Sequence, residues 1–135
     1  MPSPPVLYSP SMDFLAVALG GAAGSAARFA AQTAFRASSG AAFPWGTLAV
    51  NLLGSLLIGI CAAAAERGWP WLRPWAMTGF LGGFTTFSAF SFENVQLFRQ
   101  GQGLAFGLNI LVSVLGGIAL AWGGYLGGRA WGGGG

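Results

Sequence analysis

The sequence predicts an all-α membrane protein with four transmembrane helices, of which the third is broken at its centre. Hydrophobic residues make up 54% of the 135 residues and charged residues only 7%, whereas about a quarter of the residues in a soluble domain are charged. Charge is absent from four long stretches, residues 14–27, 37–65, 74–92 and 100–128. A helix crosses a bilayer with roughly 20 mostly apolar residues, so this alternation predicts four spans.

The first predicted span runs from about Asp13 to Phe35 and follows a proline-rich leader, residues 1–11, that we expect to be loose. The centre of this span reads G-G-A-A-G-S-A-A (20–27). Small residues at this spacing let helices approach closely in lipid. The pattern therefore predicts that the first span packs tightly against a neighbour.

The remaining spans are separated by short polar turns. They are predicted at about 45–65, 75–98 and 104–127, and the turn at 66–74 carries Trp69 and Trp71 as anchors at the membrane interface. Residues 12–128 then form one transmembrane domain, and the glycine-rich tail, residues 129–135, is expected to be mobile.

The composition argues against an enzyme, a metal site built from side chains and a nucleic-acid partner. The chain has no histidine and a single cysteine, Cys61, and its acids are Asp13, Glu66 and Glu93. Acid–base chemistry and metal ligation by histidine are therefore excluded. Its arginines are scattered singly rather than clustered as in a nucleic-acid site.

The arginines do not favour one orientation in the membrane. Four spans put both termini on one side, where Arg67, Arg73 and Arg129 would lie, against Arg28, Arg36 and Arg99 on the other. Orientation follows the excess of basic residues in the cytoplasmic loops, and three against three is no excess. Insertion in both directions, which permits an antiparallel dimer, and a single orientation set by one loop are both compatible with this count.

Polar side chains form stripes on two of the predicted spans. Thr47, Asn51 and Ser55 share one helix face, and Asn109 and Ser113 repeat the pattern in the last span. Polar groups in lipid pair with one another or line a pathway. Hydrogen bonding between helices and a polar pathway explain the stripes about equally well.

The third span is unusual because glycines and phenylalanines are interleaved in it. Gly79, Gly82 and Gly83 predict a break in this helix. Freed carbonyls are tolerated at membrane depth where they line a cavity, and they ligate cations in transporters. The ring edges of Phe87 and Phe90 carry the positive part of the quadrupole and can favour an anion, while a hydrophobic gate or ordinary packing is the simpler explanation of these rings. The residues alone predict a pathway for a small ion of either sign.

Two segments carry a specific family resemblance. G-F-L-G-G-F-T-T-F-S-A-F-S-F-E (79–93) and G-T-L-A-V-N-L-L-G-S (46–55) closely resemble the Fluc (CrcB) fluoride channels, with a G-x-A-R-type pattern before Arg28. The resemblance covers nearly the whole chain. It implies a dual-topology antiparallel homodimer in the bacterial inner membrane, with two pores along the interface that pass fluoride out passively and protect the cell from it.

The resemblance also implies roles for individual residues. Asn51 would coordinate fluoride through its amide N–H groups, and Phe87 and Phe90 would be the paired phenylalanines of the pore. The backbone carbonyls of Gly82 and Thr85 from both subunits would hold a central structural sodium ion. Arg28 would lie near the aqueous vestibule of the pore.

The chain departs from the family pattern at two places. Ala89 stands where a threonine is frequent, which removes one hydroxyl beside the phenylalanines. In the last span, where relatives carry a tyrosine and two serines, the matching positions are Asn109, Ser113 and Gly117. Together with Thr47 on the second span, Asn109 and Ser113 are the remaining candidates for the fluoride pore.

Two alternative functions differ in what they require. A small multidrug-type, proton-coupled exporter requires an ionisable carboxylate within the membrane, for which only Asp13 and Glu93 are placed. A membrane assembly subunit without transport activity requires only helix packing. For such a subunit, removing Asn51 or Phe87 would alter the stability of the protein but would not change the flux of any ion.

Overall fold

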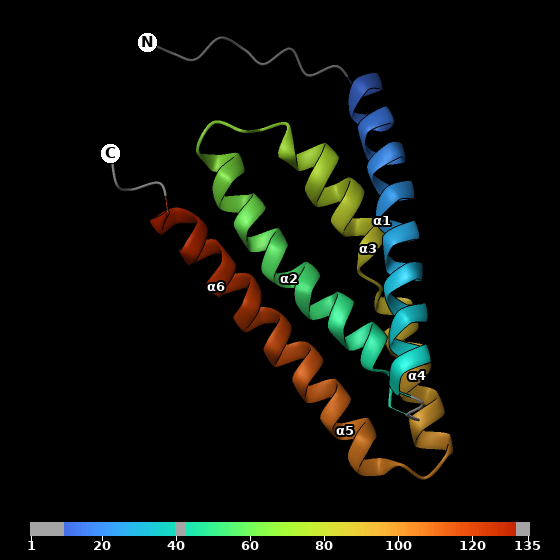
Figure 1. Cartoon of the computed structure of the whole chain (residues 1–135). Coiled ribbons are helices and arrows are strands. Elements are labelled where there is room, and N and C mark those ends of the chain that lie inside the picture. The colour runs from blue at the N-terminus through green and yellow to red at the C-terminus, as the bar shows by residue number, and fades with distance from the viewer. Residues whose placement is uncertain (1–9, 40–42, 132–135) are drawn as a thin grey trace, which may run out of the picture.

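The protein is all helical over the part of the chain that the structure, a computed structural model, describes, namely residues 10–39 and 43–131 (Figure 1). Residues 1–9 of the predicted leader and residues 132–135 of the predicted tail lie outside it. The elements in chain order are α1 (Pro10–Ser39), α2 (Trp45–Glu66), η1 (Arg73–Leu81), α3 (Gly82–Phe84), α4 (Phe87–Arg99), α5 (Gly103–Leu111), η2 (Val112–Gly116) and α6 (Gly117–Ala130).

The outer helices are longer than their apolar cores. α1 starts at Pro10 and ends at Ser39, beyond both predicted ends of the first span. Proline suits the first helical position because the N–H that it lacks would have no partner there. Asp13 in the first turn and Arg36 in the last complement the helix dipole. The end of α6 is extended in the same way, with Arg129 in its last turn.

Glycines set the packing of α1 against the third segment, which consists of η1, α3 and α4. A Cβ atom on Gly20 would lie 2.6 Å from the carbonyl oxygen of Trp75, and one on Gly24 would overlap the carbonyl of Phe80. From the other side, a Cβ on Gly83 would meet the carbonyl of Gly21. The close approach predicted from the small residues of the first span is therefore confirmed.

The three glycines expected to loosen the third segment all remain helical, and the chain departs from helical geometry just after them. Gly79 lies within the π-helical segment η1, and Gly82 and Gly83 continue the helix in α3. The chain leaves helical geometry two residues later, with extended conformations at Thr85 (φ −82°, ψ 157°) and Thr86 (φ −150°, ψ 115°). Gly79 and Gly83 instead serve the contact with α1, where a side chain would collide with the backbone of that helix, whereas Gly82 does not contact α1.

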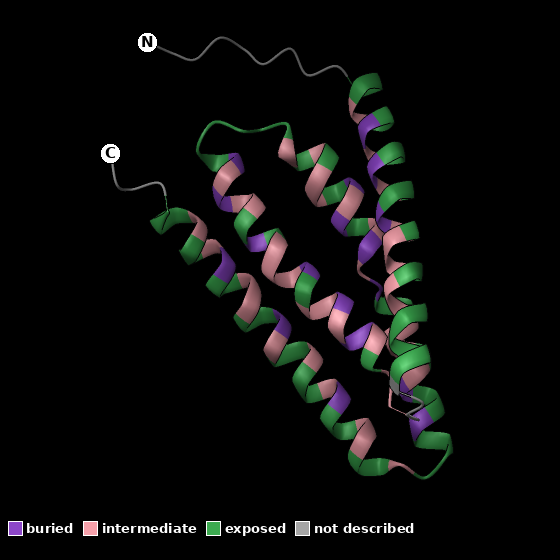
Figure 2. Ribbon diagram, viewed as in Figure 1, coloured by how far each residue is buried: buried purple, intermediate pink, exposed green. Residues whose placement is uncertain are grey.

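α2 occupies the middle of the bundle, with α1 and the third segment on one side and α5–α6 on the other (Figure 1). Its long contact with α6 is another glycine contact, since a Cβ on Gly59 would meet the carbonyl of Ala121, and one on Gly124 would meet that of Leu56. In Figure 2 buried residues follow the inner faces, and exposed residues cover the outside.

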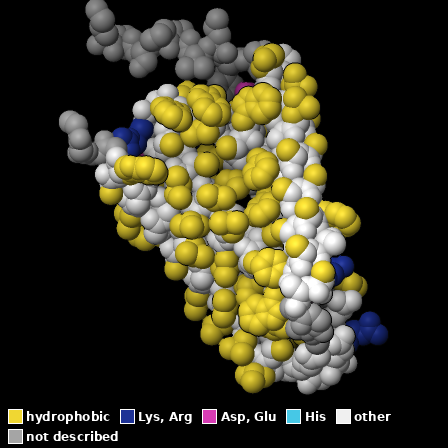
Figure 3. All heavy atoms as spheres, viewed as in Figure 1, with side chains coloured by type: hydrophobic (Ala, Val, Ile, Leu, Met, Phe, Trp, Pro, Cys, Tyr) yellow, Lys and Arg dark blue, Asp and Glu magenta, His cyan; other side chains and the backbone are white. Residues whose placement is uncertain are grey.

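The side chains on the outside of the bundle are large and apolar, whereas many of those in its interior are small. Phe14 is 78% exposed and Leu104 79%, whereas Ala63 is 0% exposed and Ala16 1%. Hydrophobic side chains cover the face seen in Figure 3, with few charges among them. This distribution suits lipid rather than water. It identifies a multi-pass membrane protein.

Within the described part of the chain, three helices are long and apolar enough to cross a membrane, namely Pro10–Ser38, Trp45–Glu66 and Gly103–Ala130. The third predicted span is divided among η1, α3 and α4, each of which is too short by itself. The count of four spans therefore stays a prediction.

Candidate functional site

One asparagine on α2 satisfies the backbone where the third segment leaves helical geometry. Asn51 Nδ2 donates to the carbonyl oxygen of Thr86 at 3.0 Å, and Asn51 Oδ1 accepts from the Thr86 N–H at 2.7 Å. Unpaired backbone groups in the hydrocarbon region cost several kcal/mol each. The carboxamide thus supplies the acceptor that the Thr86 N–H has lost and gives the Thr86 carbonyl a further donor. The second N–H of Nδ2 is left for another acceptor.

Thr86 also starts the helix that follows. As the N-cap of α4, its hydroxyl accepts from the N–H of Ala89 at 3.2 Å and pairs with the hydroxyl of Ser88 at 3.2 Å. Sequence reasoning missed Thr86, although a threonine directly before a helical pattern is a recognised N-cap signal. Thr86 is therefore the residue through which Asn51 holds the start of α4.

The carbonyls of Gly82 and Thr85 have lost the N–H partners that a continuous helix would give them. The Thr86 N–H, which a continuous helix would aim at the carbonyl of Gly82, donates to Asn51 instead. Thr85 is extended, and both its N–H and its hydroxyl donate to the carbonyl of Leu81, at 3.0 and 2.9 Å. The predicted sodium ligands are thus carbonyl oxygens outside the regular helical pattern, which suit a hard cation. Among the described residues no group of three or more acidic, histidine or cysteine side chains offers an alternative metal site.

A cavity of about 410 Å³ opens beside Asn51, between α2, the third segment and the η2–α6 helix. It brings together four of the predicted pore residues, namely Asn51, Phe87, Phe90 and Ser113. Gly82, Thr85 and Thr86 also line it. No charged side chain is among its lining residues, so the polar side chains at the cavity are amides and hydroxyls.

Phe87 and Phe90 lie together at this cavity. Their ring centroids are 5.6 Å apart and their planes are inclined by 41°. Phe87 is 78% exposed although it directly follows Thr86, which is buried. The two rings therefore form an apolar wall on the open side of the cavity.

Asn109 lies apart from the cavity lining, in a chain of hydrogen bonds between α5 and α4. It is 1% exposed, and its Nδ2 donates to Oδ1 of Asn94 at 3.3 Å. Asn94 in turn donates to the carbonyl of Phe90 at 2.8 Å, and the hydroxyl of Ser113 donates to Asn109 at 3.5 Å. The stripe on the last span thus divides, with Ser113 at the cavity and Asn109 in the helix contact.

Thr47 is likewise outside the cavity lining. Its hydroxyl accepts from Gln32 Nε2 at 2.9 Å and donates to Glu93 Oε1 at 2.6 Å, which joins α1, α2 and α4. The other carboxylate oxygen of Glu93 is buried and has no hydrogen-bond partner among the described residues. Sequence reasoning missed Gln32, because a glutamine near a helix end carries no distinctive signal.

Arg28 holds the third segment just before the break. Its Nε donates to the carbonyl of Gly83 at 3.0 Å, and the hydroxyl of Ser25 approaches the same oxygen at 3.4 Å. Arg28 does not line the cavity. Its position in a vestibule stays a prediction.

Comparison with known proteins matches residues 15–125 to the family described as CrcB-like protein, Camphor Resistance (CrcB). The fluoride-specific ion channel FluC of Rhizobium etli is 50% identical over 111 residues, 79% of this chain and 86% of the relative. That of Leptospira interrogans is 45% identical over 118 residues, covering 84% and 92%. That of Vibrio cholerae is 43% identical over 112 residues, covering 81% and 89%.

Proposed function

The chain belongs to the CrcB family, and on that premise we propose that it is a fluoride-selective channel. It lets fluoride leave the cell passively across the bacterial inner membrane and so protects the cell from fluoride toxicity. The observation that carries this proposal is the cavity at which Asn51, Phe87, Phe90 and Ser113 meet without a charged side chain.

Neutral donors suit a pore for a small and strongly hydrated anion. A permeating ion needs groups that replace its water, yet binding must stay weak enough for it to leave. The free N–H of Asn51 is such a donor. The hydroxyl of Ser113, whose bond to Asn109 is long at 3.5 Å, would become a second donor by turning toward the ion. Ring edges of Phe87 and Phe90 add weak positive potential without a full charge.

The proposed assembly is an antiparallel homodimer of four-span subunits, with the third segment as a span broken at Thr85 and Thr86. One bundle leaves the cavity open, since Phe87 and its neighbour Ile118 are 78% and 66% exposed. A second copy would close it and complete two pores. The balance of three arginines against three supports insertion in both orientations.

A structural sodium ion at the dimer centre belongs to the same proposal. The carbonyl oxygens of Gly82 and Thr85 would hold it, two from each subunit, and they fit because neither has its helical partner. Bound sodium would supply fixed positive potential close to the anion path. The chain itself contributes the unwound backbone and Asn51, which keeps it unwound.

Fluoride efflux from liposomes tests the function directly. Purified protein is expected to release trapped fluoride rapidly, read by a fluoride electrode, while trapped chloride stays inside as in protein-free liposomes. No fluoride release from folded, dimeric protein would contradict the proposal. Proton-driven drug uptake that Glu93→Gln abolishes would then support the exporter, and no transport of any kind would support the assembly subunit.

Removal of sodium tests the proposed cation site. After exchange into buffer with N-methyl-D-glucamine as the only cation, we expect fluoride efflux to fall to background and the dimer to dissociate in detergent. Adding sodium back should restore both, because the carbonyl ligands remain in place. Unchanged efflux and an unchanged dimer fraction without sodium would remove the ion from the proposal and leave the channel intact.

A further inference from the structure

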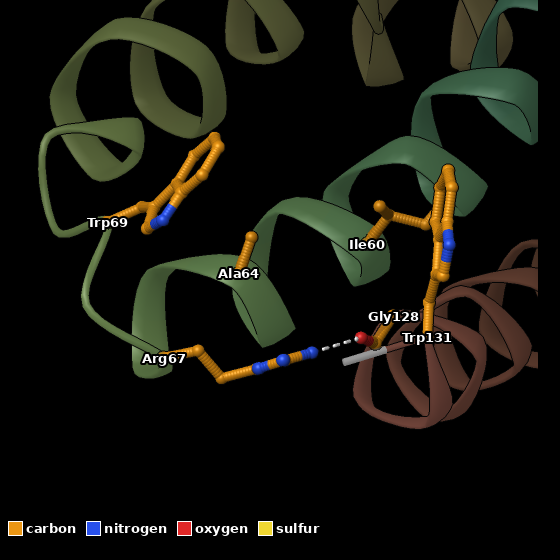
Figure 4. A pocket seen from close by; sticks show the side chains of 6 residues that line it. All are labelled: Ile60, Ala64, Arg67, Trp69, Gly128 and Trp131. Atoms are coloured by element: carbon orange, nitrogen blue, oxygen red, sulfur yellow. Dashed lines mark hydrogen bonds between the residues drawn. The ribbon is translucent and has the colours of Figure 1, made fainter. Parts of the chain in front are cut away.

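A second cavity lies at the opposite end of α2 from Thr47, where α2, the turn after it and the end of α6 meet (Figure 4). Its volume is about 400 Å³, within the ~300–1,000 Å³ range of small-molecule sites. It is lined by Ile60, Ala64, Arg67, Trp69, Gly128 and Trp131. None of these residues belongs to the candidate site described above.

The floor of this cavity is apolar and indole rings flank it. Ile60 and Ala64 point into it from consecutive turns of α2, with Trp69 on one side and Trp131 on the other (Figure 4). Trp69 is 58% exposed and Trp131 92%. Tryptophans are enriched where membrane meets water, so the cavity lies at the level where a lipid headgroup joins its acyl chains.

Arg67 brings a positive charge to the rim. Its Nη1 donates to the neutral carbonyl of Gly128 at 3.0 Å. The adjacent carboxylate, Glu66, accepts from the Tyr125 hydroxyl at 2.8 Å. A guanidinium has five N–H donors in a fork that matches phosphate. Arg67 therefore keeps donors and its charge for an anionic ligand.

The surrounding end of the bundle is also basic. Arg73 begins η1 and Arg129 lies in the last turn of α6, so this end carries three arginines against two carboxylates, Glu66 and Asp13. Each basic residue near an anionic membrane surface contributes about 1 kcal/mol of attraction. The charge around the cavity is thus complementary to an anionic headgroup.

We propose that this cavity binds one anionic phospholipid. Its phosphate pairs with the Arg67 guanidinium, and an acyl chain covers Ile60 and Ala64 between the two indoles. A phospholipid fits better than a soluble phosphate because most of the lining is apolar.

Native mass spectrometry of the purified full-length chain tests the proposal. Phosphatidylglycerol and phosphatidylcholine with the same acyl chains are titrated separately, and the lipid-bound fraction and dimer fraction are read together. We expect the chain to bind phosphatidylglycerol more tightly, and Arg67→Ala to weaken that binding about fivefold. Arg73→Ala is the control, because it removes the same charge from the same end of the bundle but outside the cavity. It should weaken phosphatidylglycerol binding far less.

A second variant separates a built site from general surface charge. Ala64→Phe keeps every charge but fills the cavity, so it should also lose phosphatidylglycerol, and millimolar inorganic phosphate should not displace the lipid. Equal binding of the two lipids, equal losses in Arg67→Ala and Arg73→Ala, or normal binding by Ala64→Phe would each overturn the proposal. A lower dimer fraction in both cavity variants would assign the cavity to a subunit contact instead, which also overturns it.

Discussion

Asn51→Ala is expected to abolish fluoride efflux and to destabilise the protein at the same time. The alanine removes the donor at the cavity, and it also leaves the N–H and the carbonyl of Thr86 without the partners that they now have at 2.7 and 3.0 Å. Each buried group left unsatisfied costs about 1–3 kcal/mol. The measurements are fluoride efflux from liposomes and thermal unfolding in detergent.

Asn94→Ala is the matched control for this prediction. Asn94 is buried and hydrogen-bonded to Asn109 and to the carbonyl of Phe90, yet it lies outside the cavity lining. We expect this variant to unfold at a lower temperature but to keep its efflux once reconstituted. Full efflux in Asn51→Ala, or equal loss in both variants, would contradict the role assigned to Asn51.

Gly24→Ala is expected to prevent stable packing of α1 on the third segment. A Cβ at this position would overlap the backbone carbonyl of Phe80, which cannot rotate away as a side chain can. Overpacking of this kind costs about 1–3 kcal/mol and sometimes more. The shift of α1 would also pull Arg28 from the carbonyl of Gly83. Thermal unfolding and the yield of folded protein after size exclusion measure the effect.

Gly21→Ala on the same helix should behave in the opposite way. A Cβ there would lie 3.8 Å from the carbonyl of Gly79, an ordinary contact distance. Alanine favours the helix over glycine by up to about 1 kcal/mol, so this variant should be as stable as the parent or more stable. Similar losses in the two variants would show that glycine flexibility, rather than close approach, is what α1 requires.

Helical spacing alone placed the predicted polar residues of the second and last spans on common helix faces. Asn51 and Ser113 were found because polar residues on an apolar helix are rare, and both line the cavity. Thr47 and Asn109 share those faces but bond to Glu93 and Asn94 outside it. Helical spacing shows which residues face the same way, and it does not show which neighbour each one meets along the helix.

The sequence by itself determined the membrane class, the apolar helices and the tight packing of the first of them. These properties follow from composition and local spacing, which act through the cost of placing charge and unpaired backbone in lipid. Only the tertiary structure decided where the third segment leaves helical geometry. Glycine propensity favoured a break near Gly79, Gly82 and Gly83, but all three stay helical, and α1 packs closely against Gly79 and Gly83. Asn51 instead satisfies the backbone at Thr86, a partner 35 positions away in the chain, so the break is stable there.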